Sequence, residues 1–311
     1  MGRTERWLGA REAGRRIEGW HAPQLILFEP FFCSFLQLFS KYRAKNDSVN
    51  FFLVLFLGMR QEERLGLILD RLSRKGTLGV ADLAAELGVS TASVRRDLEV
   101  LEEQHLLSRT HGGAVANTLA YELPMRYRGG RQKEEKRRIA AMAVTRLGEG
   151  VVSLGLTGGT TTTEVARALA NLTGLTIVTN ALNIASDLAM RPNLKLIVTG
   201  GTARSESYEL VGPLAEASLE GLHLDLAIVG VDGISAKGGL TTHHDVEAHT
   251  NRALIEHARR VIVVADGSKV GRMAFARICP ISEMHELITD GSADSGELEQ
   301  LREAGIAVTI A

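Results

Sequence analysis

Residues 80–101 read VADLAAELGVSTASVRRDLEVL, the most informative stretch in a chain of 311 residues. It predicts two short helices, because leucines and valines recur at helical spacing in both of its halves. Gly88 supplies a left-handed turn residue between them, and Ser90 is a favoured N-cap for the second helix. A short helix, a glycine turn and a second capped helix in this order predict a helix-turn-helix.

The second of these helices carries the side chains expected to contact DNA. Val94, Leu98 and Leu101 form its buried stripe and leave small polar and basic residues outside. A recognition helix presents its N-terminal turn to the major groove, where small residues permit close approach and arginines reach guanine edges or phosphates. The predicted DNA contacts on this helix are Ser90, Thr91, Ser93, Arg95 and Arg96.

The flanking segments complete a winged form of the motif. Residues 65–72 hold leucines and an isoleucine at helical spacing, and Gly76 is expected to end this first helix. Residues 106–115 read LLSRTHGGAV, which is typical of a hairpin with a Gly-Gly tip. This hairpin is the predicted wing, and Arg109 and His111 are its candidate DNA contacts. An ordinary three-helix scaffold with a solvated arginine pair is the alternative.

The remainder of the chain alternates short apolar runs with helical segments. This pattern predicts a largely parallel sheet covered by helices, so the fold class expected for the chain is α/β with an N-terminal winged helix-turn-helix. Ligands of such sheets bind at the carboxyl ends of the strands. The apolar runs are residues 151–154, 176–179, 195–198, 224–229 and 260–264.

A loop suited to phosphate follows the first of these runs. Residues 155–163 read GLTGGTTTT and open a helix, where backbone N–H groups, hydroxyls and the helix dipole together form an anion site. A tight turn with N-capping threonines is the alternative, but four consecutive threonines exceed what a cap needs. The predicted phosphate contacts in this loop are Gly159, Thr160, Thr161 and Thr162.

Polar residues also follow the other predicted strands. Lys269 would neutralise a bound phosphate dianion, although an exposed loop lysine is the alternative interpretation. His243, His244 and His249 raise the question of a metal site, but His244 and His249 are five residues apart rather than three or four, and we expect neither metal nor cofactor. The further candidates for ligand binding are Asn180, Gly201, Asp232, Lys237 and Glu247.

The composition agrees with a folded protein of two domains. Hydrophobic residues make up 45% of the chain and charged residues 23%, as in globular proteins. A formal net charge of −1 argues against a protein that coats nucleic acid non-specifically. Cys33 and Cys279 lie far apart without partner motifs, so we expect reduced thiols in a cytoplasmic protein.

The predicted organisation has four parts. Residues 1–58 hold two aromatic-rich runs, each shorter than the ~20 apolar residues that span a bilayer, and we expect an ill-ordered extension. A membrane-surface or partner-binding arm is the alternative for this segment. The winged helix-turn-helix occupies residues 59–116, and the ligand-binding domain occupies residues 132–311. Residues 117–131 lack periodicity and are predicted to be a solvated linker, with contacts of its arginines to the DNA backbone as the alternative.

Several motifs together resemble the DeoR family of sugar-metabolism regulators from Met59 to the C-terminus. The resemblance implies a repressor of carbohydrate-metabolism genes that binds double-stranded operator DNA as a homo-oligomer and is relieved by a phosphorylated sugar, with no membrane attachment. One departure is Thr157, where the family commonly has Asp. The motifs are RQEER (60–64), SVRRDL (93–98), RTHGGA (109–114), GGTTT (158–162), GVDG (230–233), GGLTT (238–242) and DGSK (266–269).

The ligand-binding domain also resembles ribose-5-phosphate isomerase in its expected fold. Asp232, Lys237 and Glu247 lie where such an enzyme places polar residues. A carboxylate that abstracts a proton and a cation that stabilises the enediolate are what isomerisation requires. A sugar-phosphate isomerase-like activity is therefore the alternative function. The fused DNA-binding module favours a sensor over an enzyme, since a shared fold does not establish catalysis.

Overall fold

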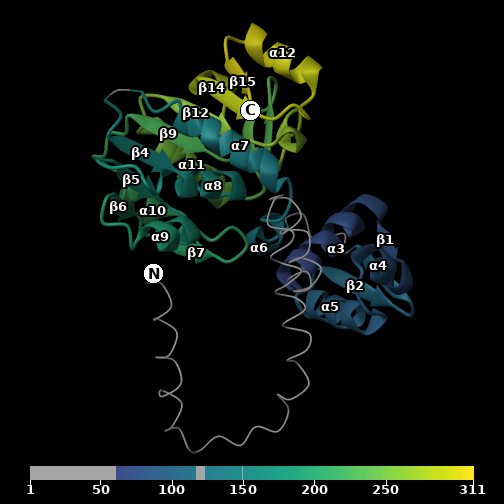
Figure 1. Ribbon diagram of the computed structural model, residues 1–311. Helices are drawn as coiled ribbons and strands as arrows, with labels where there is room; N and C mark the ends of the chain where they lie inside the picture. Colours follow the sequence, from purple (N-terminus) through teal and green to yellow (C-terminus); the bar gives the residue numbers. More distant parts are fainter. Residues whose placement is uncertain (1–60, 117–122, 149) are drawn as a thin grey trace, which may run out of the picture. The chain divides into compact units, whose positions relative to one another are not determined.

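The computed structural model describes residues 61–116, 123–148 and 150–311 (Figure 1). The predicted extension, residues 1–58, and the first part of the predicted linker, residues 117–122, lie outside the described residues. Within the described part of the chain, no helix is long and apolar enough to cross a membrane.

Three helices and a three-stranded antiparallel sheet form the N-terminal domain. Gly88 has φ 65° and ends the second helix, and the Ser90 hydroxyl accepts a hydrogen bond from the Ser93 N–H at 3.1 Å, which confirms both predicted turn residues. The sheet has the order β1-β3-β2, and the sequence predicts only the β2–β3 hairpin. The elements are α3 (Gln61–Lys75), β1 (Thr77–Gly79), α4 (Val80–Leu87), α5 (Thr91–Glu103), β2 (Leu107–Thr110) and β3 (Gly113–Ala116).

A buried ion pair joins the first and third helices of this domain. The Asp97 carboxylate on α5 is 1% exposed and accepts hydrogen bonds from the Arg64 guanidinium on α3, one of them at 2.9 Å. Gln61 donates a third hydrogen bond to the same carboxylate, at 3.3 Å. A buried carboxylate that loses such partners is strongly destabilising, so this cluster fixes α5 against α3.

A short helix interrupts the segment that the sequence describes as a solvated linker. This helix is α6 (Met125–Arg128), and both Met125 and Tyr127 are buried. The next helix, α7 (Lys133–Val144), agrees with the predicted opening of the ligand-binding domain. Four residues of one turn lack the periodicity that sequence analysis detects, which explains why α6 is not predicted.

The C-terminal domain is built on a seven-stranded parallel sheet of order β15-β14-β12-β9-β4-β5-β6, as the alternation of apolar runs and helices predicts (Figure 1). Its strands are β4 (Ser153–Leu156), β5 (Thr176–Thr179), β6 (Lys195–Val198), β9 (Leu226–Val229), β12 (Val261–Val264), β14 (Glu286–Thr289) and β15 (Ala307–Ile310). The other strands are β7 (Thr202–Arg204), β8 (Glu209–Val211), β10 (Gly233–Ser235), β11 (Gly239–Thr242) and β13 (Ala276–Cys279).

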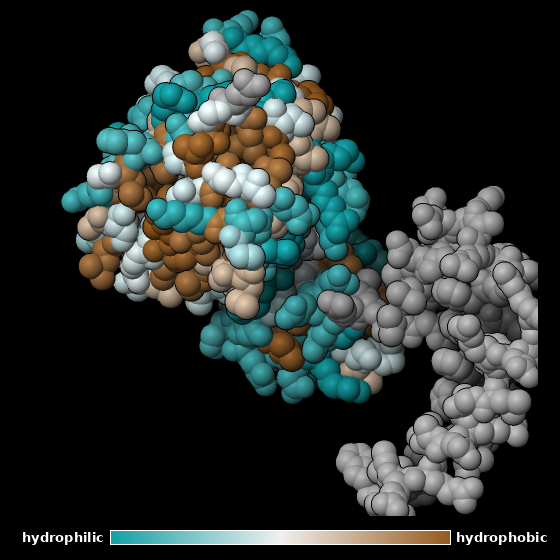
Figure 2. Space-filling view, turned by 60° about the vertical axis from the view of Figure 1, so that its left-hand side comes forward, coloured by the Kyte–Doolittle hydropathy of each residue, from teal (hydrophilic) through white to brown (hydrophobic). Residues whose placement is uncertain are grey.

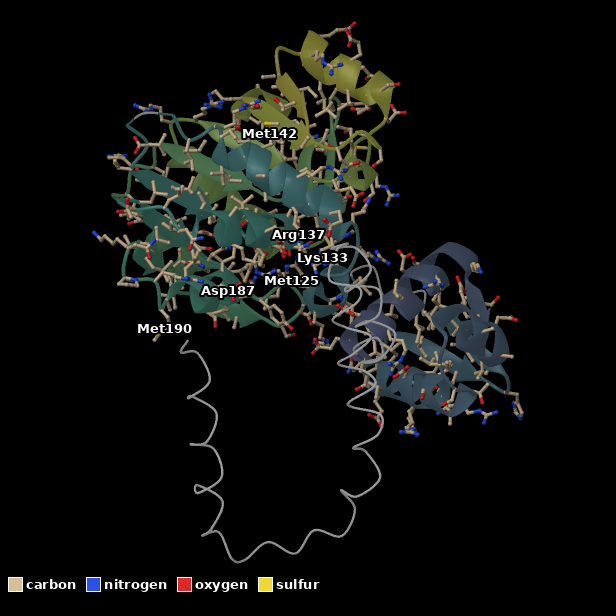
Figure 3. The ribbon with its side chains drawn as sticks, in the orientation of Figure 1. Met125, Lys133, Arg137, Met142, Asp187 and Met190 are labelled. Atoms are coloured by element: carbon tan, nitrogen blue, oxygen red, sulfur yellow. The ribbon has the colours of Figure 1, made fainter. Side chains whose placement is uncertain are left out.

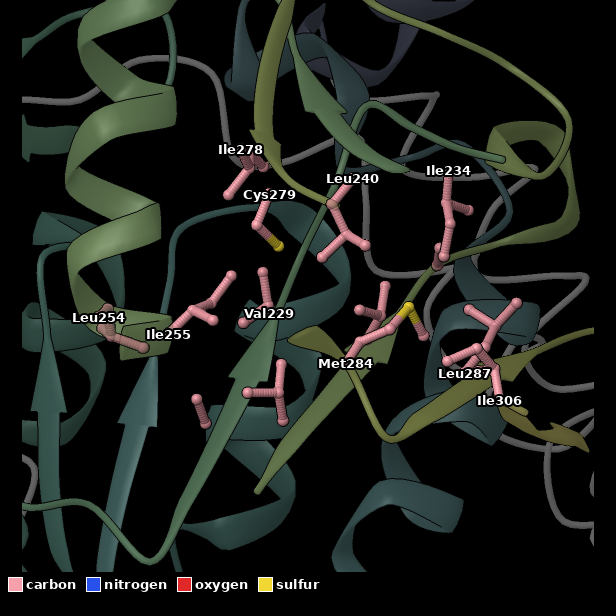
Figure 4. Close-up of a cluster of buried hydrophobic side chains, with 14 of the residues drawn as sticks. Val229, Ile234, Leu240, Leu254, Ile255, Ile278, Cys279, Met284, Leu287 and Ile306 are labelled. Carbon is pink, nitrogen blue, oxygen red and sulfur yellow. The ribbon is translucent and has the colours of Figure 1, made fainter. Parts of the chain in front are cut away.

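Both faces of this sheet are covered. Successive residues of β9 point to opposite faces, Leu226 and Ile228 to one core cluster and Ala227 and Val229 to the other. The first cluster includes residues of α7, α8 and α9, and the second includes residues of α11, α12 and the β10-β11-β13 sheet; Figure 4 shows part of the second, around Val229. The helices are α8 (Thr160–Leu169), α9 (Leu182–Leu188), α10 (Pro213–Ala217), α11 (Asp245–Glu256) and α12 (Ser295–Glu303), with single turns η1 (Gly267–Lys269) and η2 (Ile281–Glu283).

Asp97→Ala should lower the free energy of unfolding of the N-terminal domain by about 3 kcal/mol, because it leaves the Arg64 guanidinium without its buried carboxylate. Urea denaturation of the full chain, followed by circular dichroism, measures the change. Glu99→Ala is the matched control, since the Glu99 side chain on the same helix is 58% exposed. Equal stability of the two variants would contradict a structural role for the ion pair.

Candidate DNA interface and ligand pocket

The exposed side of α5 carries the predicted DNA contacts. Thr91, Arg95 and Arg96 are exposed, because Val94 and Leu98 on the opposite side are buried in the domain core. Ser93 is half-buried, and its hydroxyl lies 3.0 Å from the Ser90 hydroxyl at the helix cap. These two serines therefore hold the N-terminal turn of α5 in place, while the threonine and the two arginines remain available to DNA.

The predicted wing lies against the same end of α5. A shallow groove is lined by Thr91 and Arg95 from α5 and by Arg109 and His111 from the hairpin, so four predicted contacts share one surface. The Arg109 N–H donates to a Glu102 carboxylate oxygen at 2.9 Å, which ties the wing to α5. The Arg109 guanidinium also lies 3.8 Å from the half-exposed Glu102 carboxylate, so an acidic residue of the last turn of α5 lies beside the wing.

A pocket in the C-terminal domain lies at the carboxyl ends of β4, β9 and β12, three neighbouring strands at the centre of the sheet. From β4 the chain proceeds outward through β5 and β6, then returns to β9 on the other side of β4. The strand order thus reverses between β4 and β9, and open parallel sheets bind ligands at such a point. This is the position that the sequence predicts for the ligand.

The turn after β4 supplies the anion-binding geometry of this pocket. Gly159 has φ 122°, a conformation that favours glycine, and it begins α8. The hydroxyls of Thr162 and Thr163 donate to the Gly159 carbonyl at 2.9 and 2.6 Å, back to the residue before the helix, and α8 has no side-chain cap. Thr160 and Thr161 line the pocket instead. The run of threonines therefore divides into two whose hydroxyls bond to the Gly159 carbonyl and two that line the pocket.

Basic side chains from two stretches of the chain, residues 128–136 and 269–272, line the same pocket. Lys269 donates to Oδ1 of Asp232 at 3.2 Å, and Arg128 donates to the same oxygen at 3.0 Å. Burial alone would raise the pKa of Asp232, but Lys269 and Arg128 lower it to about 2. The basic residues of the lining are Arg128, Arg131, Lys136, Lys269 and Arg272, and the acidic ones are Glu209, Asp232, Glu247 and Asp266.

Two buried charged residues of the pocket were not predicted from the sequence. Lys136 on α7 is 4% exposed, and burial lowers the pKa of its ammonium to about 8. Glu209 on β8 is 2% exposed, and burial together with neighbouring Glu247 raises the pKa of its carboxyl well above the usual range. Displaced pKa values in a pocket are typical of functional sites.

Six of the ten residues predicted to bind ligand line the pocket, namely Gly159, Thr160, Thr161, Asp232, Glu247 and Lys269. Thr162 and Asn180 are buried outside the lining, where Thr162 donates to the Gly159 carbonyl and the Asn180 amide donates to the Glu209 carboxyl group at 3.4 Å. Gly201 lies against β8, where a Cβ atom would come within 2.9 Å of the Val211 backbone. Lys237 is exposed in the turn between β10 and β11.

Glu209 lies beside the turn in which Thr157 replaces the Asp that is common in similar sequences. The Thr157 hydroxyl is fully buried and accepts a hydrogen bond from the Gly230 N–H at 3.0 Å, so it joins the ends of β4 and β9. A carboxyl group nevertheless reaches this turn, since Glu209 Oε1 accepts a hydrogen bond from the Gly158 N–H at 2.8 Å. In this chain the acidic group beside the loop therefore comes from β8.

The last part of the predicted linker lines the pocket and is only partly exposed to solvent. Arg128 and Arg131 line it, with side chains 18% and 31% exposed. The description of this part of the linker as solvated is therefore wrong, because short-range periodicity gives no information about a distant ion-pair partner. Among the described residues, no group of three or more His, Cys, Asp or Glu side chains is arranged to hold a metal ion.

Comparisons with known proteins match both domains. A model described as "DeoR-like helix-turn-helix domain" matches residues 64–119, and one described as "DeoR C terminal sensor domain" matches residues 131–291. The putative aga operon transcriptional repressor of Escherichia coli O157:H7 is 36% identical over 80% of this chain and 93% of its own length. The glycerol-3-phosphate regulon repressor of Escherichia coli K12 is 35% identical over 75% of this chain and 92% of its own.

Among solved structures, ribose 5-phosphate isomerase A from Neisseria gonorrhoeae matches 44% of this chain and 53% of its own length. Its TM-score is 0.34 and its sequence identity 18%.

Arg95→Ala or Arg96→Ala should weaken binding to the chain's target DNA, by about 1–3 kcal/mol where the arginine contacts a base. Gel shifts at one fixed salt concentration measure the change, because phosphate contacts make affinity dependent on salt. Arg302→Ala is the control, since it removes an exposed arginine from α12 in the other domain. Unchanged binding by both α5 variants would rule out this helix as the recognition helix.

Glu209→Gln should stabilise the chain at neutral pH. Because its pKa is raised, Glu209 holds its proton to higher pH in the folded state than in the unfolded chain, which releases it above about pH 4.3. The penalty on folding is therefore absent in acid and grows as the pH rises toward the folded pKa. Urea denaturation at pH 4.5 and pH 7.5 should show a gain only at the higher pH, with the exposed Glu303→Gln as control; an equal effect at both values would refute the assignment.

Proposed function

The chain belongs to the DeoR family and is a DNA-binding transcription regulator, not an enzyme, and we propose that it represses carbohydrate-metabolism genes until a phosphorylated sugar binds its pocket. The observation that carries this proposal is the pairing of the α8 N-terminal turn with Lys269 and the other basic side chains of the pocket. A helix N-terminus with exposed N–H groups and facing cations favours a dianion. A relative named for a glycerol-3-phosphate regulon supports a phosphorylated ligand here too.

The proposed effector contacts come from two groups of residues that line the pocket. Thr160 and Thr161 with Lys269 would hold the phosphate, and Asp232 and Glu247 would accept hydrogen bonds from sugar hydroxyls. The effector would bind one arrangement of the sensor better than another and so shift the population of DNA-competent molecules. The differential affinity of the two states for the ligand sets the size of that shift.

We also propose that the chain acts in the cytoplasm as a homo-oligomer on repeated operator half-sites, because recognition helices of this class commonly bind as symmetric pairs. Exposed apolar side chains on the sheet edge and the neighbouring helices support a contact between copies. Figure 2, which brings the left-hand side of Figure 1 forward, shows apolar surface among hydrophilic residues. The most exposed of these side chains are Leu182, Met190, Val198 and Leu214.

An isomerase-like reaction is not supported by the placement of its candidate residues. Asp232 and Glu247 meet at the Thr242 hydroxyl, at 3.1 and 2.7 Å, but Lys237 is exposed in a hairpin turn and does not line the pocket. The relatives reported above are named as repressors.

Thr161→Val should weaken effector binding about tenfold, because it removes a hydroxyl donor to the phosphate while nearly keeping the shape of the side chain. DNA binding without effector should persist. A panel of phosphorylated sugars is first screened by thermal shift against the full chain, and each hit is then titrated against the protein–operator complex. Thr145→Val, which removes an exposed hydroxyl from the end of α7, is the control.

The same compounds are incubated with the purified protein and followed for aldose–ketose conversion. DNA release without conversion agrees with the proposed function. Conversion at enzyme-like rates without any effect on DNA contradicts it. The absence of any thermal shift or DNA release across the panel also contradicts it, because the pocket would then not bind sugar phosphates.

A further inference from the structure

The short helix α6 belongs to the core of the DNA-binding domain. Tyr127 is 4% exposed and packs in the same apolar cluster as Ile68 and Leu98. Its hydroxyl donates to the Gln104 side chain at 2.6 Å, and a Cβ atom on Gly66 of α3 would lie 2.6 Å from its carbonyl oxygen. The absence of a side chain at Gly66 thus allows the α6 backbone to contact α3 directly.

Arg128, the residue that follows Tyr127, lines the sensor pocket. Arg128 forms its 3.0 Å ion pair with Asp232, which follows β9. Beyond it, the Lys136 ammonium donates to the carbonyl oxygens of Arg128 and Arg131, at 3.3 and 2.6 Å. A segment of nine residues, from Arg128 to Lys136, therefore forms one wall of the pocket, and it begins at a residue adjacent to the core of the DNA-binding domain.

The Asp232 carboxylate is paired with the two cations that would bind a phosphate. Its side chain is 8% exposed, and one oxygen, Oδ1, accepts hydrogen bonds from both Arg128 and Lys269. The other oxygen, Oδ2, lies 3.1 Å from the Thr242 hydroxyl. The two bound cations share the pocket lining with Thr160 and Thr161 of the α8 turn. A dianion at that turn and the Asp232 carboxylate would compete for the same two positive charges.

We propose that Arg128 is a ligand for the phosphate group of the effector and that Asp232 is its competitor within the chain. This inference rests on the proposed function and deepens it. When the phosphate binds beside Thr160 and Thr161, Arg128 exchanges Asp232 for the phosphate oxygens. Because Tyr127 is fixed in the DNA-binding domain, the exchange acts on the backbone that joins this domain to the sensor.

Calorimetric titration of the full-length chain with inorganic phosphate, at constant ionic strength, tests the assignment. Inorganic phosphate reports the charged contacts alone, without any contribution from sugar hydroxyls. Arg128→Gln should lower its affinity about tenfold, and Asp232→Asn should raise it about tenfold, because the amide no longer competes for the cations. Changes of opposite sign cannot both arise from loss of folding.

Arg137→Gln is the matched control, since it removes an arginine of α7 that is 52% exposed and is not among the residues that line the pocket; Figure 3 labels it. Its phosphate affinity should equal that of the unaltered chain. Unchanged affinity of Arg128→Gln, or reduced or unchanged affinity of Asp232→Asn, would show that the ion pair only holds the linker in place. Failure of both the unaltered chain and Asp232→Asn to bind phosphate overturns the proposal too.

The sugar-phosphate experiment distinguishes failure of this inference from failure of the proposed function. If sugar phosphates release operator DNA from the unaltered chain and from Arg128→Gln at equal concentrations, the function stands and Arg128 is not a ligand. If they release DNA from the unaltered chain but only at about tenfold higher concentration from Arg128→Gln, the inference is supported as well.

Discussion

The order β12-β9-β4 at the centre of the sheet is the constraint on which the sensor depends. Parallel strands buried on both faces must be apolar along their length, so polar groups concentrate where the strands end. The reversal of strand order between β4 and β9 separates the loops that follow them and leaves room for a ligand. The turn at Gly158–Thr161, Asp232 and Lys269 reach one pocket because their three strands are neighbours.

The same pocket holds three buried ionisable groups whose pKa values are displaced. Lys136, Glu209 and Asp232 are buried, and their pKa values are displaced in the directions that burial or ion pairing dictates. A protein that needed only stability would replace such groups with apolar ones, since buried charges seldom contribute net stability. Their concentration beside an anion-binding turn indicates that the site is organised for a charged, polar ligand rather than for packing.

Local motifs were predictable from the sequence, and contacts between distant segments were not. Gly88 and Ser90 act on their own backbone, so spacing alone identifies them and the helix-turn-helix. The turn with Thr160 and Thr161 is local in the same sense. Lys136 lies in the run KEEKRR, which has the composition of a solvated helix face, and only the docking of α7 buries it. Lys237 illustrates the opposite case, since the sequence predicts it at the ligand site and the structure places it in an exposed turn that does not line the pocket.

The linker shows why this distinction matters for regulation. A flexible connector would let the two domains respond independently, because conformational freedom in the connector absorbs any change at one end. Here α6 packs in the DNA-binding core, while Arg128 and Arg131 line the pocket of the sensor. Arg131 also pairs with Asp70 on α3 at 2.7 Å, so this pocket residue contacts the DNA-binding domain directly. Coupling requires that a ligand interact differently with two states of such an element, and a pocket wall that is packed into the DNA-binding core supplies the physical connection through which the proposed effector would act.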